Sequence, residues 1–138
     1  TMFVADFIGS PAMNFLPFTG TIAEGATEAR LANATIAVPR QHDGAQGELV
    51  LGVRPEHVHL ADDGALRGEV VAREYLGTTQ ILSLETAHGP LKARVSSADA
   101  VHEGARVGLD FTPSTVTLFE AKTGRALRSD LNAEVLHG

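Results

Sequence analysis

The chain has 138 residues and no cysteine, which suits one domain and excludes disulfides, thiolate metal sites and cysteine nucleophiles. Its net charge is −6, with two lysines against nine arginines, so it lacks the positive field that drives non-specific binding to nucleic acid. No apolar run reaches the roughly 18 residues that a membrane span requires.

Helical spacing marks the beginning of the chain. Phe3, Val4, Phe7 and Ile8 share one helical face, and a glycine–serine–proline sequence at positions 9–11 ends the pattern. We expect a short helix over residues 2–8, followed by a linker. On this interpretation residues 1–13 close a preceding domain, and the chain is part of a longer protein.

From about Asn14 the hydrophobic period changes from helical to two. Apolar and polar residues alternate over residues 49–53, 66–73, 91–95, 106–111 and 116–118, with Leu66, Val70 and Ala72 expected on one face. Such alternation is typical of antiparallel strands with one buried and one solvated face. Turn residues separate the runs, for example Asp43-Gly44 and Asp62-Asp63-Gly64. The spacing predicts a mainly β domain, a small barrel or sandwich, over residues 14–128.

The tail, residues 129–138, fits either a short helix or a frayed end. Upstream, Met13, Phe15 and Phe18 form an apolar group directly after the linker. Two interpretations of this group are compatible with each other: it begins the core of the domain, and part of it packs against a neighbouring domain.

Catalytic motifs are absent from the sequence. No glycine is followed by lysine, so there is no phosphate-binding loop, and neither G-x-G-x-x-G nor G-x-S-x-G occurs. Each of these motifs is required by the geometry of its site. We therefore expect this chain not to be an enzyme and not to hydrolyse ATP by itself.

Two short segments have alternative interpretations. His57 and His59 share a strand face ahead of Asp62 and Asp63, which suggests a metal site; the alternative is two solvated histidines before a polar turn, and we favour it. The turn over residues 75–79 has a glycine and two hydroxyls that could bind a small anion through backbone amides.

The Arg54-Pro55-Glu56 segment follows the strand over residues 49–53. Proline removes a backbone donor, so we expect the strand to end or to become an edge here. Arg54 and Glu56 could pair with each other. Alternatively, the arginine could contact another domain or subunit. Both interpretations stay open.

Two longer motifs carry a family resemblance. Phe7-Ile8-Gly9-Ser10-Pro11-Ala12-Met13-Asn14-Phe15-Leu16 and Leu51-Gly52-Val53-Arg54-Pro55-Glu56-His57 together resemble the C-terminal regulatory (TOBE) domain of the ATP-binding subunits of carbohydrate-type ABC importers, the maltose and glycerol-3-phosphate importer ATPase family. Weaker similarity continues through Gly68-Glu69-Val70 to Leu118-Phe119 and Gly124-Arg125-Ala126-Leu127, so the resemblance covers nearly the whole chain.

The resemblance implies an OB-like (TOBE/MOP-like) antiparallel barrel with a short N-terminal helix. It also implies a non-catalytic regulatory and dimerisation domain; the alternative is a module of the same barrel type that senses an oxyanion or a sugar phosphate. ATP and Mg²⁺ would bind the separate ATPase domain, and no cofactor is expected here. The implied location is cytoplasmic, peripheral to the inner membrane.

The implied partners are the chain's own ATPase domain, a second copy of the subunit, the permease subunits reached through the parent chain and, in some relatives, a regulatory protein. No nucleic acid is expected. The candidate interface and linker residues are Phe7, Gly9, Ser10, Pro11, Asn14, Phe15, Arg54, Pro55, Glu56 and His57. No catalytic or metal-binding residue is assigned.

Overall fold

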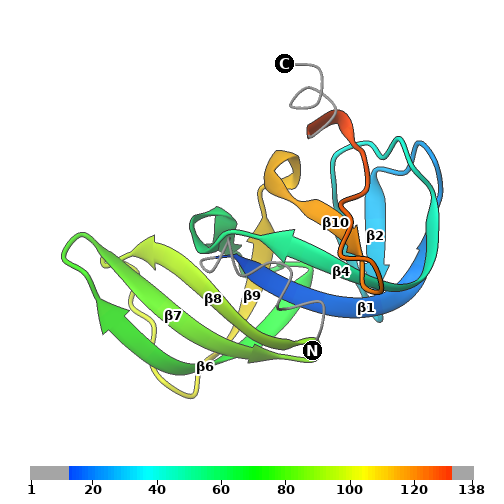
Figure 1. The fold of residues 1–138 in the computed structure, drawn as a ribbon. Helices are drawn as coiled ribbons and strands as arrows, with labels where there is room; N and C mark the ends of the chain where they lie inside the picture. Colours follow the sequence, from blue (N-terminus) through cyan, green and yellow to red (C-terminus); the bar gives the residue numbers. More distant parts are fainter. Residues whose placement is uncertain (1–12, 132–138) are drawn as a thin grey trace.

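The computed structural model describes residues 13–131, which form mainly antiparallel β-strands (Figure 1). The strands are β1 (Asn14–Ile22), β2 (Glu28–Leu31), β3 (Ala34–Ala37), β4 (Ala45–Val53), β5 (Val58–Leu60), β6 (Leu66–Tyr75), β7 (Thr79–Thr86), β8 (Gly89–Ser96), β9 (Arg106–Phe111) and β10 (Thr117–Glu120). Two short 3₁₀ turns are η1 (Pro55–His57) and η2 (Pro113–Thr115). The predicted β fold is confirmed. The helix expected over residues 2–8, and with it Phe7, Gly9, Ser10 and Pro11, lies outside the described residues.

The strands form three groups. One sheet has the order β1-β4-β10, the second is the β2-β3 hairpin, and the third has the order β5-β9-β6-β7-β8. Strand β8 lies beside β1, β5 and η1, so the large sheet curls and nearly closes into a barrel (Figure 1). Strands from the first half of the chain pair with strands near its end: β4 is hydrogen-bonded to β10, and β5 to β9.

One apolar core connects all three groups. Its members come from every strand, including Leu16 of β1, Leu51 of β4, Leu82 of β7 and Leu109 of β9, each of them almost completely buried. The inward positions predicted for Leu49, Leu51, Val53, Leu66, Val70, Leu91, Ala93, Leu109, Phe111, Val116 and Leu118 are confirmed. The alternation of apolar residues therefore predicted most of the core correctly.

One expectation about side-chain direction and one about burial were wrong. Ala72 is exposed, because a β-bulge between Val70 and Ala72 shifts the register of β6 against β7 and turns the following residues over. Val50 and Gly52 are buried although they face away from the main core, since a second small apolar cluster covers that side of β4.

The end of the described chain is packed against the domain. Leu127 is buried, and Ser129 forms a β-bridge with Gln41. A helical turn begins at Asp130 and Leu131; the rest of the tail, 132–138, lies outside the described residues. No helix among residues 13–131 is long and apolar enough to cross a membrane.

Candidate functional site

Asn14 connects strand β1 to strand β8, which belong to different sheets. Its side-chain amide nitrogen donates to the carbonyl oxygen of Lys92 at 2.8 Å, and its side-chain oxygen accepts from the backbone nitrogen of Lys92 at 2.8 Å. The side chain therefore imitates one residue of a neighbouring strand along the edge of β8. With 8% of its surface exposed, Asn14 is one of the few buried polar residues in residues 13–131.

Phe15 and Gly52 belong to the second apolar cluster. The rings of Phe15 and Phe119 meet edge to face, with centroids 6.0 Å apart. A Cβ at Gly52 would lie 2.8 Å from Phe119 Cε2 and 3.0 Å from Met13 Sδ, closer than side-chain atoms pack. Glycine is therefore required at this position of the sequence motif by the packing of Phe119. This supports the core interpretation of Phe15 and leaves the proposed contact with another domain as a prediction.

The corner formed by Arg54, Pro55 and Glu56 ends β4 as predicted, and Pro55 begins η1. Arg54 and Glu56 are exposed, and the ion pairs of the described residues include none between them. The first alternative for this corner, an internal ion pair, is therefore not formed. Contact with another domain or subunit stays a prediction.

The histidines near this corner are bound locally. His59 Nε2 lies 2.6 Å from Thr112 Oγ1, and the backbone carbonyl of His57 accepts a hydrogen bond from Thr112 N. Within residues 13–131 no group of three or more histidine and carboxylate side chains has the geometry to hold a metal ion.

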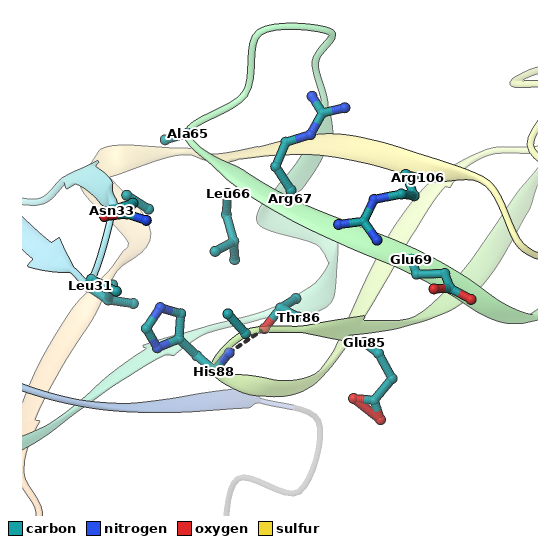
Figure 2. Close-up of a pocket in the computed structure, with 13 residues that line it drawn as sticks. Leu31, Asn33, Ala65, Leu66, Arg67, Glu69, Glu85, Thr86, His88 and Arg106 are labelled. Atoms are coloured by element: carbon teal, nitrogen blue, oxygen red, sulfur yellow. Dashed lines mark hydrogen bonds between the residues drawn. The ribbon is translucent and has the colours of Figure 1, made fainter.

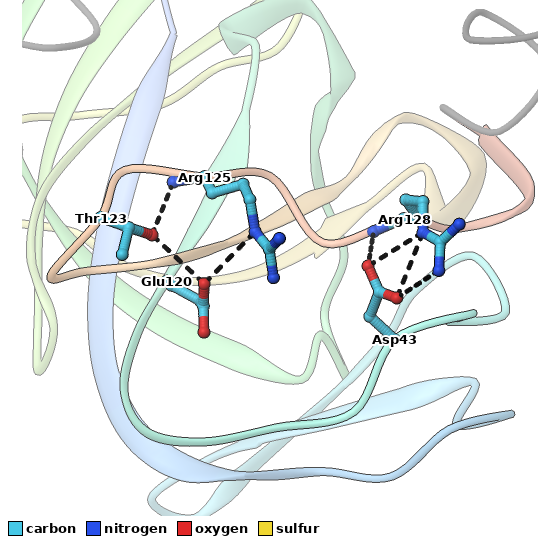
Figure 3. Close-up of polar contacts among 5 residues, drawn as sticks. All are labelled: Asp43, Glu120, Thr123, Arg125 and Arg128. Carbon is cyan, nitrogen blue, oxygen red and sulfur yellow. Dashed lines mark hydrogen bonds and ion pairs between the residues drawn. The ribbon is translucent and has the colours of Figure 1, made fainter.

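Charged residues fix the C-terminal segment to the domain (Figure 3). Arg128 donates from Nε and Nη2 to the carboxylate of Asp43, with Nη2 2.9 Å from Oδ1, and the Arg128 backbone nitrogen also donates to Asp43 Oδ2. These hydrogen bonds from Arg128 lower the pKa of Asp43 below its usual value. Beyond them His42 Nε2 lies 2.6 Å from Asp130 Oδ1. Sequence reasoning missed these pairs, because 85 residues separate Asp43 from Arg128.

An open groove with a volume of about 570 Å³ lies between the β2–β3 turn, the start of β6 and the β7–β8 turn (Figure 2). Arg67 and Arg106 line it, and both also line an adjoining hollow of about 300 Å³. Neither guanidinium is in an ion pair among the described residues. Glu69, the cross-strand neighbour of Arg106, and Glu85 give the groove carboxylates as well. Alternation predicted Arg67, Glu69 and Arg106 on the solvated faces of their strands and did not indicate a groove.

The turn after Tyr75 uses some of its polar groups internally. Leu76 N donates to Thr79 O, and the hydroxyl of Ser97 donates to the carbonyl of Gly77. Gly77 has a φ of 90°, which explains glycine at this position. Tyr75 and Leu76 are 58% and 44% exposed.

Two family models match the chain. The TOBE domain model covers residues 51–119, and the MalK OB fold domain model covers residues 9–58. Among curated proteins, the sn-glycerol-3-phosphate import ATP-binding protein UgpC of Cereibacter sphaeroides is 39% identical over 92% of this chain. The maltose/maltodextrin import ATP-binding protein MalK of Salmonella typhimurium is 37% identical over 91%, and the multiple sugar-binding transport ATP-binding protein MsmK of Streptococcus mutans is 34% identical over 91%.

These matches occupy only part of each relative. The chain spans about a third of the length of the curated relatives, 35% to 36%. Among solved structures, the cytoplasmic molybdate-binding protein ModG superposes with a TM-score of 0.55, at 19% identity, over 76% of this chain and 94% of that one. This last likeness concerns the fold alone.

Proposed function

Because the chain belongs to the TOBE domain family, we propose that it is the non-catalytic regulatory and dimerisation domain of an ABC importer ATPase subunit. The observation that carries this proposal is the pattern of the matches. Three importer ATP-binding proteins align with more than nine-tenths of the chain, yet the aligned part is only about a third of each relative.

In this proposal ATP and Mg²⁺ bind a separate ATPase domain of the parent chain, and the solute is a sugar or a sugar phosphate. The parent would dock on permease subunits at the cytoplasmic side of the inner membrane. The absence of a phosphate-binding loop from the sequence supports a non-catalytic role. The exposed corner at Arg54 and Glu56 supports a role in contacts, because its charged groups have no internal ion pair within the described residues.

Self-association of the 138-residue chain tests the proposal. Sedimentation velocity measured up to about 1 mM protein detects an association free energy of about −4 kcal/mol. We expect the weight-average sedimentation coefficient to rise with concentration from the monomer to the dimer value. A chain that stays monomeric over this whole range contradicts the dimerisation role.

A second candidate function is the sensing of a small oxyanion or sugar phosphate. The observation in its favour is the pair of guanidinium groups, Arg67 and Arg106, which line two adjoining hollows and form no ion pair within residues 13–131. Titration calorimetry with phosphate, sulfate, molybdate and glycerol 3-phosphate tests it. Heat with one of these anions that disappears in Arg67→Ala and Arg106→Ala supports sensing, and no heat with any of them removes it.

A further inference from the structure

The large exposed hydrophobic side chains of the described residues lie close together in the sequence. Val71, Tyr75 and Leu76 are 49%, 58% and 44% exposed, and all three belong to the second half of β6 and the turn that follows. Tyr75 is paired with Gln80, which is buried, so its side chain lies on the opposite side of the sheet from that of Ile81 in β7, and Arg73 stacks over its ring at 5.0 Å. The exposed apolar side chains therefore mark this end of β6 and not one particular face of it. This end of the molecule lies far from β2 and β10 (Figure 1).

The second half of β6 has a partner strand on one side only among the described residues; on its other side the segment before β9 contacts it, through hydrogen bonds of Val70 with Gly104 and Ala105 and from Arg73 to the carbonyl of Val101. Strand β9 pairs only with residues 66–69 of β6, so the residues after the bulge are paired through β7 alone among the described strands. Val71 is the extra residue of the bulge, and it has no partner in the register. Bulges are features that redirect side chains at edges and binding sites, which fits an exposed valine here.

The outer face of β6, β7 and β8 has an ordered arrangement of charge. Ile81 of β7 is paired with Glu74 of β6 on one side and with Arg94 of β8 on the other. Because Leu82 and Leu84 are buried, Ile81 and these two partners face outward, and Glu74 and Arg94 are exposed. An acidic residue and a basic residue therefore flank a central apolar one. The next outward row is Ala72, Ser83 and Lys92.

From this arrangement we infer that the outer face of β6–β8 is where two copies of the chain meet, around a two-fold axis along β7. Such an axis exchanges the positions of β6 and β8 between facing sheets. It sets Glu74 opposite the partner's Arg94, and Ile81 opposite the partner's Ile81. The face is thus complementary to itself, as a two-fold interface requires. This inference rests on the proposed dimerisation function and assigns a surface to it.

The neighbouring charges are compatible with this geometry. Glu85 faces outward four residues beyond Ile81, which is about 13 Å along a strand. The twist of facing sheets separates their strands away from the crossing point, so the two Glu85 carboxylates lie apart. Lys92 would lie over the partner's Ala72, where its aliphatic stem covers apolar surface and its ammonium reaches solvent.

Charge reversal tests the inference directly. We expect Glu74→Arg and Arg94→Glu, each alone, to raise the dimer dissociation constant about tenfold or more, because each places like charges opposite each other. The double variant exchanges the two signs and should restore association toward that of the unmodified chain. Thermal unfolding of all three variants verifies that the fold is retained. Single variants that dimerise as tightly as the unmodified chain overturn the inference and leave dimerisation through another surface intact.

Cross-linking gives a second readout, which reports which residues lie close together when two copies meet. The chain has no cysteine, so Ile81→Cys introduces a unique thiol at the expected axis. Facing sheets are about 10 Å apart, too far for a disulfide, so the probe is a short bismaleimide. Thr35→Cys, on the exposed side of β3, is the control. Faster dimer cross-linking of the Ile81→Cys chain than of the Thr35→Cys chain supports the inference; equal rates for the two variants overturn it and leave dimerisation through another surface intact.

Discussion

At the scale of single residues, Asn14 shows how one side chain can close a barrel. A strand at the edge of a sheet has unpaired backbone groups, and burial makes them costly unless a partner satisfies them. The carboxamide of Asn14 has one donor and one acceptor in the right geometry, and it satisfies both backbone groups of Lys92. A short motif that resembles a linker sequence thus has a structural role in the domain itself.

Replacing this side chain should destabilise the domain. Asn14→Ala leaves the backbone nitrogen and oxygen of Lys92 without their partners, and we expect unfolding to become easier by about 2–4 kcal/mol. Urea denaturation followed by far-ultraviolet circular dichroism measures the change. Asn33→Ala, at an exposed turn, is the matched control and should stay within about 0.5 kcal/mol of the unmodified chain. Equal stability of the two variants would argue against a closing role for Asn14.

The Asp43–Arg128 pair makes a prediction about acid stability. The hydrogen bonds from Arg128 lower the pKa of Asp43 in the folded chain, so its stabilisation is complete above the ordinary aspartate pKa of about 3.9 and is lost as pH falls through the lower folded pKa. We expect Asp43→Asn to lower the melting temperature at neutral pH, and the difference to shrink toward zero as the pH falls below about 4.

Melting temperatures measured across this acidic range test the prediction. Asp63→Asn is a suitable comparison, because Asp63 is exposed and has no ion pair among the described residues. A melting-temperature difference between the unmodified chain and Asp43→Asn that stays constant down to about pH 2 would show that the charge of Asp43 is not what stabilises the C-terminal segment.

At the scale of elements, the loop between β5 and β6 packs directly on the backbone of β9. A Cβ at Gly108 would lie too close to Ala61 O, and one at Gly64 would lie too close to the backbone of Leu109. Ala61 N also donates to Gly108 O at 3.0 Å. Neither glycine has a positive φ, so backbone conformation does not explain them. Both are required because the two backbones approach too closely for a Cβ.

Substitution of these glycines should therefore strain the backbone. For Gly108→Ala we expect a destabilisation of about 3 kcal/mol, the upper end of the usual range for overpacking, because the contacted atom belongs to the backbone and cannot rotate away. Gly20→Ala in β1 is the control, since its Cβ would make only ordinary contacts of 3.6–3.7 Å. Chemical denaturation of the two variants measures the difference. Similar stability of both would mean that the loop moves freely away from β9.

The elements also show what the sequence could predict. Strand β8 was predictable, because Leu91 and Ala93 point inward while Lys92 and Arg94 point outward, which is the period of two expected for a half-buried strand. The exposure of Ala72 was not predictable, since a bulge depends on the partner strand. The burial of Val50 depends on Phe119, which is distant in sequence. The candidate dimer face likewise depends on the register that places Glu74 and Arg94 on either side of Ile81.

At the scale of the whole molecule, the two family models divide a chain that folds as one unit. The boundary between them falls near residues 51–58, yet β4 and β5, at this boundary, pair with β10 and β9 from the far end of the chain. The main apolar core also includes residues from both parts. A domain built in this way has one shared core, so we expect its two parts to fold and unfold together.

Division of the chain tests this cooperativity. If the chain is cut within the Asp62–Gly64 turn, the first fragment keeps β1–β5 without β9 and β10, and the second keeps β6–β10 without β4 and β5. We expect each fragment alone to lack a cooperative thermal transition, because each loses its pairing strands and half of the core. Mixing equimolar fragments should restore the β-sheet circular dichroism signal and one calorimetric transition.

The intact chain should unfold with a heat-capacity increase of about 1.8 kcal/mol/K, as expected for a single unit of its length. A fragment that melts cooperatively by itself would show two separable folding units instead, and the two family models would then describe independent modules.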